Sequence, residues 1–267
     1  MKKFMAFTMS AVMLLSLAAC AKTDAEETTT AAETEATTTA AETEATTTAA
    51  ETEAVETEAV ETEAATVEAM SYDEYMAAKV DEEVVITAYV QATQSWYNDC
   101  ITAYLADEDG AYFCYKMACS EEDAALLVPG TEIKVTGYKA EWSGEVELAE
   151  GATFEILDGN YIAEAKDVTD LVGSDEIVDY QNQLVKFTDM TVVSVEFKDD
   201  EYDKDIYLTV SKDDTEYGFC LEYYLNGSDE EFYNLVSGLE AGQTVDVEGF
   251  LYWYEGVNTH ITAVTVK

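Results

Sequence analysis

The sequence predicts an all-β fold of two tandem five-stranded barrels, each with a short helix between its third and fourth strands, behind a disordered linker. From residue 84 onward, short β-branched and aromatic runs alternate with turn residues every 8 to 12 positions, which is typical of a sandwich or small barrel. Seven positions recur after a constant offset of 112 residues. Residues 21 to 70 show neither pattern, so we expect the folded part to begin at residue 71.

Residues 1 to 20 are predicted to be a signal peptide. Lys2 and Lys3 precede a 16-residue apolar run at 4 to 19, which is shorter than the ~20 residues needed to span a bilayer. The run ends Leu-Ala-Ala-Cys, which resembles a bacterial lipobox. The resemblance implies that the Cys20 thiol is lipidated and anchors the mature chain to the extracytoplasmic side of the cell membrane. The alternative is an ordinary signal peptide in which Cys20 falls by chance.

Residues 21 to 70 are predicted to be a disordered acidic linker. A nonapeptide of Thr, Ala and Glu occurs three times, at 28 to 36, 37 to 45 and 46 to 54. The segment has no aromatic residue, Leu, Ile, Gly or Pro, and it cannot bury enough surface to offset the entropy of ordering it. We therefore interpret it as a spacer between the membrane and the folded part.

The two predicted domains cover residues 71 to 158 and 159 to 267. In the first, strands are expected near 84–94, 100–106, 111–118, 131–141 and 145–157. Its helix is capped by Ser120 and runs to Leu127, because Pro129 and Gly130 stop it. In the second domain, a helix runs from Ser228 to about Leu239, and strands are expected near 184–196, 205–211, 216–224, 243–252 and 258–266.

The offset of 112 relates the two domains residue by residue. It matches Leu127, Gly130, Ile133, Val135, Gly137, Tyr138 and Gly144 with Leu239, Gly242, Val245, Val247, Gly249, Phe250 and Gly256.

A helix between strands three and four of a five-stranded barrel resembles the OB-fold. Tandem OB-like domains behind a lipobox and a Thr/Glu/Ala linker resemble a group of lipoproteins of Gram-positive bacteria. A generic β-sandwich is the competing architecture.

The first hairpin allows a prediction of register. A three-residue turn at 108–110 with Gly110 left-handed pairs Leu105 with Phe113 on the core face. The same register places Ala103 opposite Tyr115 and Ile101 opposite Met117. The other face, which is often the ligand platform of OB proteins, then carries Thr102, Tyr104, Tyr112, Cys114 and Lys116. Alternatively, a loop or the neighbouring domain covers this face.

Aromatic residues are concentrated in the loops that border the groove of an OB-like barrel. Flat rings there can stack on sugars or bases, and Trp142 and Trp253 are the main expected anchors. Alternatively, the rings close the ends of the two barrels. The predicted ligand-binding residues are Trp96, Tyr97, Tyr104, Tyr112, Trp142, Tyr252, Trp253 and Tyr254.

No metal site is predicted, although one acidic loop could offer oxygen ligands to Ca²⁺. The EF-hand pattern fails there, because Lys204 stands where Gly is needed, and a solvated loop is the simpler interpretation. The weak candidates are Asp199, Glu201, Asp203 and Asp205.

Four cysteines follow Cys20. The predicted hairpin register brings Cys100 close to Cys119, which makes this pair the better candidate for a disulfide, whereas Cys114 lies too far along the strand. No partner is assigned to Cys220. His260 is interpreted as a strand residue, because no catalytic motif accompanies it.

Charge excludes some partners. The chain has 57 acidic residues, 13 lysines and no arginine, for a net charge of -44. Phosphate binding by counterion release is therefore unfavourable, and no nucleic-acid partner is expected.

We thus expect a non-catalytic, membrane-anchored lipoprotein without a cofactor that binds an extracellular glycan or protein. The alternatives are a structural envelope protein with no small ligand, a hydrolase with two converging carboxylates, or a single-strand nucleic-acid binder. The oligomeric state is left open.

Overall fold

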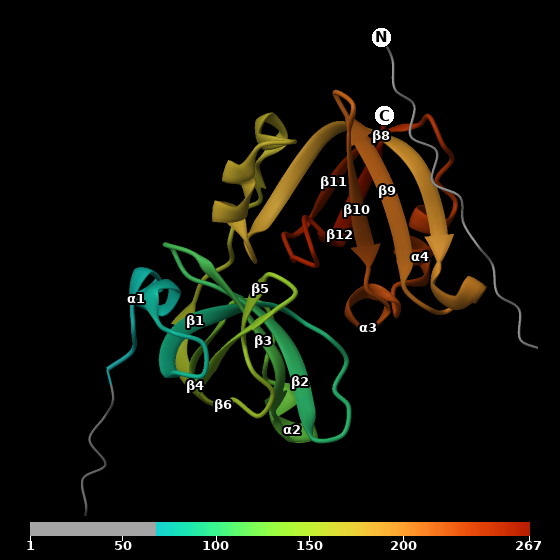
Figure 1. Cartoon of the computed structure of the whole chain (residues 1–267). Coiled ribbons are helices and arrows are strands. Elements are labelled where there is room, and N and C mark those ends of the chain that lie inside the picture. The colour runs from blue at the N-terminus through green and yellow to red at the C-terminus, as the bar shows by residue number, and fades with distance from the viewer. Residues whose placement is uncertain (1–67) are drawn as a thin grey trace, which may run out of the picture. The chain divides into compact units, whose positions relative to one another are not determined.

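The computed structural model describes residues 68–267 (Figure 1). Cys20, the signal peptide and almost all of the predicted linker lie outside these residues. Within the described part, no helix combines the length and apolar character needed to cross a membrane. The two sheets belong to one compact unit.

The first sheet is a closed five-stranded barrel with one added strand. Its order is β1-β2-β3-β5-β4, and a β1–β4 pairing closes it, while β6 adds to β4. β3 and β5 are parallel, and α2 (Glu121–Ala124) connects β3 to β4. This is the topology expected of an OB-fold. The strands are β1 (Glu83–Thr93), β2 (Cys100–Ala106), β3 (Ala111–Ala118), β4 (Thr131–Trp142), β5 (Glu145–Leu148) and β6 (Thr153–Asn160).

The second sheet repeats this order. A β8–β11 pairing closes the barrel β8-β9-β10-β12-β11, β10 and β12 are parallel, and β7 adds to β8. Two helices, α3 (Tyr223–Asn226) and α4 (Glu230–Ser237), connect β10 to β11. The prediction of two tandem OB-like barrels is confirmed. The strands are β7 (Lys166–Asp167), β8 (Leu184–Phe197), β9 (Ile206–Lys212), β10 (Thr215–Leu221), β11 (Thr244–Phe250) and β12 (His260–Val266).

Each barrel has its own core. Val84, Ile86 and Leu148 are among the core residues of the first barrel, and Phe187 and Phe219 are among those of the second. Positions related by the offset of 112 occupy equivalent places: the pairs Leu127/Leu239, Ile133/Val245 and Val135/Val247 are all buried. Gly130 and Gly242 both have positive φ, which explains why glycine recurs there.

Several predicted boundaries need correction. The fifth strand of the first barrel is not continuous: β5 ends at Leu148 and β6 begins at Thr153, with Gly151 at φ 93° between them. β6 also continues two residues past the predicted domain boundary at 158. β10 ends three residues early, because Glu222 caps α3 by accepting a hydrogen bond from the Leu225 amide.

Four further helices escaped prediction. The first, α1 (Tyr72–Ala77), begins at a capping box in which Ser71 and Glu74 bond reciprocally. The other three are short 3₁₀ helices: η1 (Thr169–Leu171) and η2 (Asp175–Tyr180) connect β7 to β8, and η3 (Lys198–Asp200) follows β8.

The predicted register of the first hairpin is right at Ile101–Met117 and wrong beyond it. A bulge shifts the pairing, so that Ala103 lies opposite Cys114 and Leu105 opposite Tyr112. Lys116 adopts φ 44° at this bulge, and the expected left-handed turn at Gly110 does not occur. The shift turns Tyr112 and Cys114 into the core and turns Phe113 outward.

Candidate functional site: a cleft between the two barrels

The outer face of the first hairpin packs against the second barrel. Tyr104 and Phe113 form a buried cluster with Phe250 from β11. The Tyr104 and Phe250 rings stack with centroids 4.5 Å apart, and the Tyr104 hydroxyl lies 2.6 Å from Nδ1 of His260. We call these four residues the sealed contact. The neighbouring domain therefore covers this part of the face, which was the alternative considered for it.

Hydrogen bonds on both sides of the sealed contact fix the two barrels together. On one side, the Ser95 amide donates to the Tyr224 carbonyl at 2.8 Å. On the other, the Trp253 amide donates to Oε2 of Glu145, and the Glu255 amide donates to the carbonyl of Ser143, both at 2.8 Å. The relative position of the barrels is thus defined by polar contacts as well as by apolar ones.

Beside the sealed contact lies a cleft of about 910 Å³. The first barrel lines it with β2, β3, the end of β4 and the loop after β1. The second barrel lines it with β9, β10, the start of α3, the start of β12, and the loops after β8 and after β11. In an OB-fold, strands two and three and these loops carry the ligand. Each barrel therefore turns toward the same cleft the elements that carry the ligand in OB-folds.

Aromatic rings dominate the cleft wall. Trp142, at 53% exposure, and Tyr254 are tilted against one another with centroids 5.1 Å apart. They occupy positions related by the offset of 112, so the same loop of each barrel supplies a ring to the same place. The aromatic lining residues are Tyr97, Phe113, Tyr115, Trp142, Tyr207, Phe219, Tyr224, Tyr252 and Tyr254.

Two lysines line the cleft, and each has a carboxylate partner. Lys198 bonds Oδ2 of Asp205 at 2.8 Å, and Asp205 also accepts from the Tyr223 amide. Lys116 lies 3.8 Å from Glu150 and above the Tyr115 ring.

Gln94, Glu222 and Asn258 are among the further polar side chains of the lining. Gln94 donates to the Tyr104 hydroxyl, and Oε2 of Glu222 caps α3. Asn258 carries a buried Oδ1 that accepts from no donor within the described residues. The cleft wall thus combines flat rings with hydrogen-bonding groups.

Burial shifts the titratable groups at the floor of the cleft toward their neutral forms. It raises the pKa of Glu222 to about 7 and lowers that of His260 to about 4. It also raises the pKa of the Cys220 thiol well above its usual value. An imidazole with so low a pKa is a weak general base, and a thiol that stays un-ionised is a weak nucleophile.

Half of the predicted ligand-binding residues line the cleft. Tyr97, Trp142, Tyr252 and Tyr254 line it, and Tyr104 lies in the sealed contact beside it.

The structure places the other three predicted ligand residues elsewhere. Trp96 packs on the first core and donates to the Cys119 carbonyl at 2.8 Å, and Tyr112 lies within that core. Trp253 packs against the second core.

Sequence reasoning missed several lining residues. Tyr115 was assigned to the core because the bulge at Lys116 was not foreseen. Tyr207 and Tyr224 belong to β9 and α3 of the second barrel, and the offset of 112 does not find Tyr207, because it relates this residue to Ser95 and not to a residue of the first hairpin. No local sequence pattern identifies Glu222 as a cleft residue, because the cleft is formed by both barrels together.

The candidate metal ligands do not converge. Asp199, Glu201 and Asp203 lie on an exposed loop, whereas Asp205 turns inward to Lys198. Among residues 68–267, no group of three or more Asp, Glu, His or Cys side chains is placed to hold a metal ion.

The predicted disulfide is not formed. Cys100, Cys114, Cys119 and Cys220 are all free thiols in the described chain. The thiol of Cys100 donates to the Tyr97 carbonyl, whereas that of Cys119 donates to the Ser120 carbonyl. The two thiols therefore donate hydrogen bonds to carbonyl groups in separate turns of the chain.

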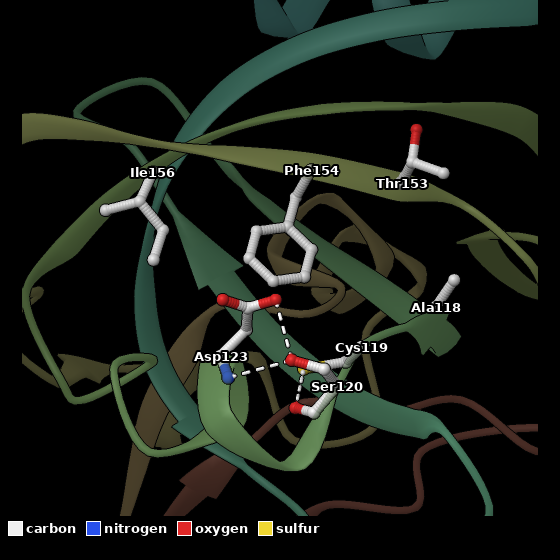
Figure 2. A pocket seen from close by; sticks show the side chains of 7 residues that line it. All are labelled: Ala118, Cys119, Ser120, Asp123, Thr153, Phe154 and Ile156. Carbon is white, nitrogen blue, oxygen red and sulfur yellow. Dashed lines mark hydrogen bonds between the residues drawn. The ribbon is translucent and has the colours of Figure 1, made fainter.

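A second hollow, of about 530 Å³, lies beside α2 (Figure 2). Its polar side chains are already engaged, because Ser120 accepts from the Asp123 amide and donates to the Asp123 carboxylate. Phe154 and Ile156 line it from β6. This hollow offers a ligand few free polar groups, so we take the interbarrel cleft as the candidate site.

No family model and no curated protein matches this chain. Among solved structures, it is similar to a murine DNA-binding protein bound to double-stranded DNA, with 12% identity over 68% of this chain and 94% of that chain, and a TM-score of 0.34. It is also similar to the tetrameric p202 HIN2, with 13% identity over 71% of this chain and 96% of that chain, and a TM-score of 0.33. The Ifi202 HINa domain in complex with 20 bp double-stranded DNA matches with 13% identity over 70% of this chain and 96% of that chain, and a TM-score of 0.33. These weak similarities carry no argument about function.

Proposed function

We propose that this protein is a non-catalytic lipoprotein of the extracytoplasmic membrane surface and that the interbarrel cleft binds an oligosaccharide. One observation carries the proposal: the OB ligand-binding elements of both barrels face the same aromatic cleft. Its volume of about 910 Å³ suits a small-molecule ligand or a few sugar rings.

The lining chemistry supports a sugar. Exposed rings such as Trp142 and Tyr97 offer flat apolar faces to the C–H faces of pyranose rings. Gln94 and Asn258 offer amide groups to hydroxyls beside those rings. An apolar drug-like ligand would leave these amides unpaired, so the combination favours a ligand with both a flat face and a polar edge.

The proposal of a non-catalytic role rests on the protonation states at the cleft floor. His260 is neutral and bonded to Tyr104, and the Cys220 thiol is un-ionised. Asp205 has both oxygens engaged, by Lys198 and by the Tyr223 amide. Neither His260 nor Asp205 is therefore free to act as a base, and Cys220 is not in its nucleophilic form.

Membrane anchorage through Cys20 is supported by the apolar run and lipobox-like sequence that precede it. With a net charge of -44, the chain has no electrostatic attraction to anionic lipid, so the acyl chains must provide retention. Cys20→Ala is expected to move the protein from the membrane fraction to the soluble fraction. Retention of the mutant would contradict the anchor.

Charge argues against nucleic acid as the ligand. Residues 71 to 267 carry 43 acidic residues and 10 lysines, and both lysines of the cleft are paired. We expect a labelled oligonucleotide to show no binding at micromolar protein and about 0.15 M salt, measured by fluorescence anisotropy. Binding under these conditions would favour a nucleic-acid role for the cleft.

A glycan screen tests the proposal directly. The purified full-length chain, in a polyoxyethylene detergent without sugar groups, is heated with a panel of oligosaccharides, and the melting temperature is recorded. A ligand at 100 times its Kd should stabilise the protein by about 2.7 kcal/mol. If no oligosaccharide raises the melting temperature, the proposal fails, and a structural envelope role supported by the sealed contact takes its place.

A further inference from the structure

The cations of the cleft are neutralised, but one of its acids is not. Lys198 is paired with Asp205, and Lys116 with Glu150. No lysine of the described chain forms an ion pair with Glu222, which lines the cleft and uses Oε2 to cap α3. A carboxyl group without a lysine partner thus faces the space where a ligand would lie, and a bound ammonium group would favour its ionised form over the neutral form that burial favours.

Further acids lie next to the cleft. An adjoining hollow of about 430 Å³ shares Tyr254 and Asn258 with the cleft and is also lined by Glu216 and Glu255. Both glutamates are exposed, and neither forms an ion pair with a lysine of the described chain. The potential at this hollow is therefore negative, and the excess of acids over lysines in residues 71 to 267 reinforces it.

Aromatic rings and unpaired carboxylates together form a cation site. The faces of Tyr and Trp rings attract ammonium groups, most strongly where water is partly excluded. Trp142, Tyr254 and Tyr224 line the same cleft as Glu222. An ammonium group has three donors and no acceptor, so it matches this lining better than a hydroxyl does.

We propose that the preferred ligand is a glycan that carries free, protonated amino groups, such as an oligomer of glucosamine, and that Glu222 recognises the ammonium. This inference rests on the proposed function, because it names the class of sugar bound in the same cleft. An N-acetylated sugar presents a neutral amide at this position and forgoes the cation–π and carboxylate contacts.

Two matched probes separate the inference from the proposed function. Isothermal titration of the full-length chain at pH 6.5 compares a glucosamine hexamer with an N-acetylglucosamine hexamer, at about 20 mM and about 300 mM NaCl. We expect the amine form to bind at least about tenfold more tightly at low salt, with a smaller ratio at high salt. If the acetylated form binds equally well or better, the inference is overturned while the proposed function stands. If neither binds, the inference fails, and the oligosaccharide panel decides the proposed function separately.

Substitutions test whether Glu222 recognises the ammonium group. Glu222→Gln keeps an oxygen to cap α3 and should reduce the affinity for the amine hexamer to that for the acetylated one, without changing the latter. Glu240→Gln, at an exposed glutamate outside the cleft, should change neither. The double variant Glu216→Gln with Glu255→Gln should weaken amine binding about threefold at low salt only. An unchanged preference in Glu222→Gln would contradict the assignment.

A hexalysine peptide controls for attraction to the charged surface as a whole. It carries ammonium groups without sugar rings, so it should bind more weakly than the glucosamine hexamer and should be insensitive to Trp142→Ala. Equal affinity for the two cations, with no effect of Trp142→Ala on either, would show nonspecific adsorption and overturn the inference.

Discussion

The sealed contact and the open cleft use the same residue types for different purposes. Tyr104, Phe113 and Phe250 are fully buried between the barrels, and Tyr104 completes its hydrogen bonding with His260. A few residues away, Tyr97 and Trp142 remain 77% and 53% exposed. Rings that the opposing barrel buries stabilise the interface. Rings that stay exposed remain available to a ligand, even where, as at Trp142, one side of the ring contacts Tyr254 of the second barrel.

The comparison also separates the two tryptophans that the sequence treats as equivalent. Trp142 and Tyr254 are the pair related by the offset of 112, and both reach the cleft. Trp253 lies one residue earlier, and successive residues of an extended chain point to opposite sides. Its ring therefore packs against the second core instead.

Removing the central ring of the sealed contact should have the largest effect on stability. Tyr104→Ala loses the stack on Phe250 and leaves His260 Nδ1 without its partner, so we expect a loss of about 3–5 kcal/mol in the free energy of unfolding, measured by chemical denaturation. Tyr104→Phe keeps the ring and should lose about 1–3 kcal/mol. A loss below about 1 kcal/mol in both variants would show that the contact contributes little.

Trp253→Ala should destabilise the second barrel. Its side chain packs against the core around Phe187 and Phe219, although part of it is exposed, so we expect a loss of about 3 kcal/mol. The hydrogen bond to Glu145 uses the backbone amide and survives the substitution. A stable variant with reduced glycan affinity would instead move Trp253 to the binding site.

Buried carboxyl groups at and near the contact between the two barrels should also make stability depend on pH. Burial raises the pKa of Glu145 to about 8 and that of Glu147 to about 7, and Glu222 behaves likewise. Unfolding returns the pKa of these groups to about 4.5. The stability that their protonated forms contribute is therefore complete below that pH and is lost as the pH rises through 7 and 8. His260 acts in the opposite sense, with stability lost as the pH falls from 6.5 through 4.

We therefore expect the melting temperature to fall by roughly 5 °C between about pH 6.5 and 9. Glu145→Gln cannot ionise and keeps an acceptor for the Trp253 amide, so it should reduce this slope. Glu240→Gln, at an exposed site, should leave the slope unchanged. A melting temperature that rises toward pH 9 would contradict the burial of these acids.

The strands were predictable because their signal is local. Runs of β-branched and aromatic residues set β1 to β4 to within about one residue, and the offset of 112 identified equivalent core positions such as Ile133 and Val245. The capping box at Ser71 was visible in the sequence and was overlooked. The order of the strands came from the resemblance to the OB-fold.

The cleft was only half predictable because it depends on long-range packing. The loop aromatics Tyr97, Trp142, Tyr252 and Tyr254 follow from the OB resemblance. The bulge at Lys116 does not, because a lysine at positive φ leaves no mark in the sequence, and it reverses the faces of Tyr112 and Tyr115. Nothing in the first barrel's sequence tells which of its exposed rings the second barrel will cover.

The comparison of sealed and open rings is tested most directly at Trp142. Its matched control is Tyr138, which is 54% exposed and lies outside the cleft. Isothermal titration with the tightest oligosaccharide of the screen should show an affinity at least about tenfold lower for Trp142→Ala and unchanged for Tyr138→Ala, with both melting temperatures within about 2 °C of the parent chain. Equal affinities for the two variants, or a large fall in the melting temperature of Trp142→Ala, would contradict the assignment of the cleft as the ligand site.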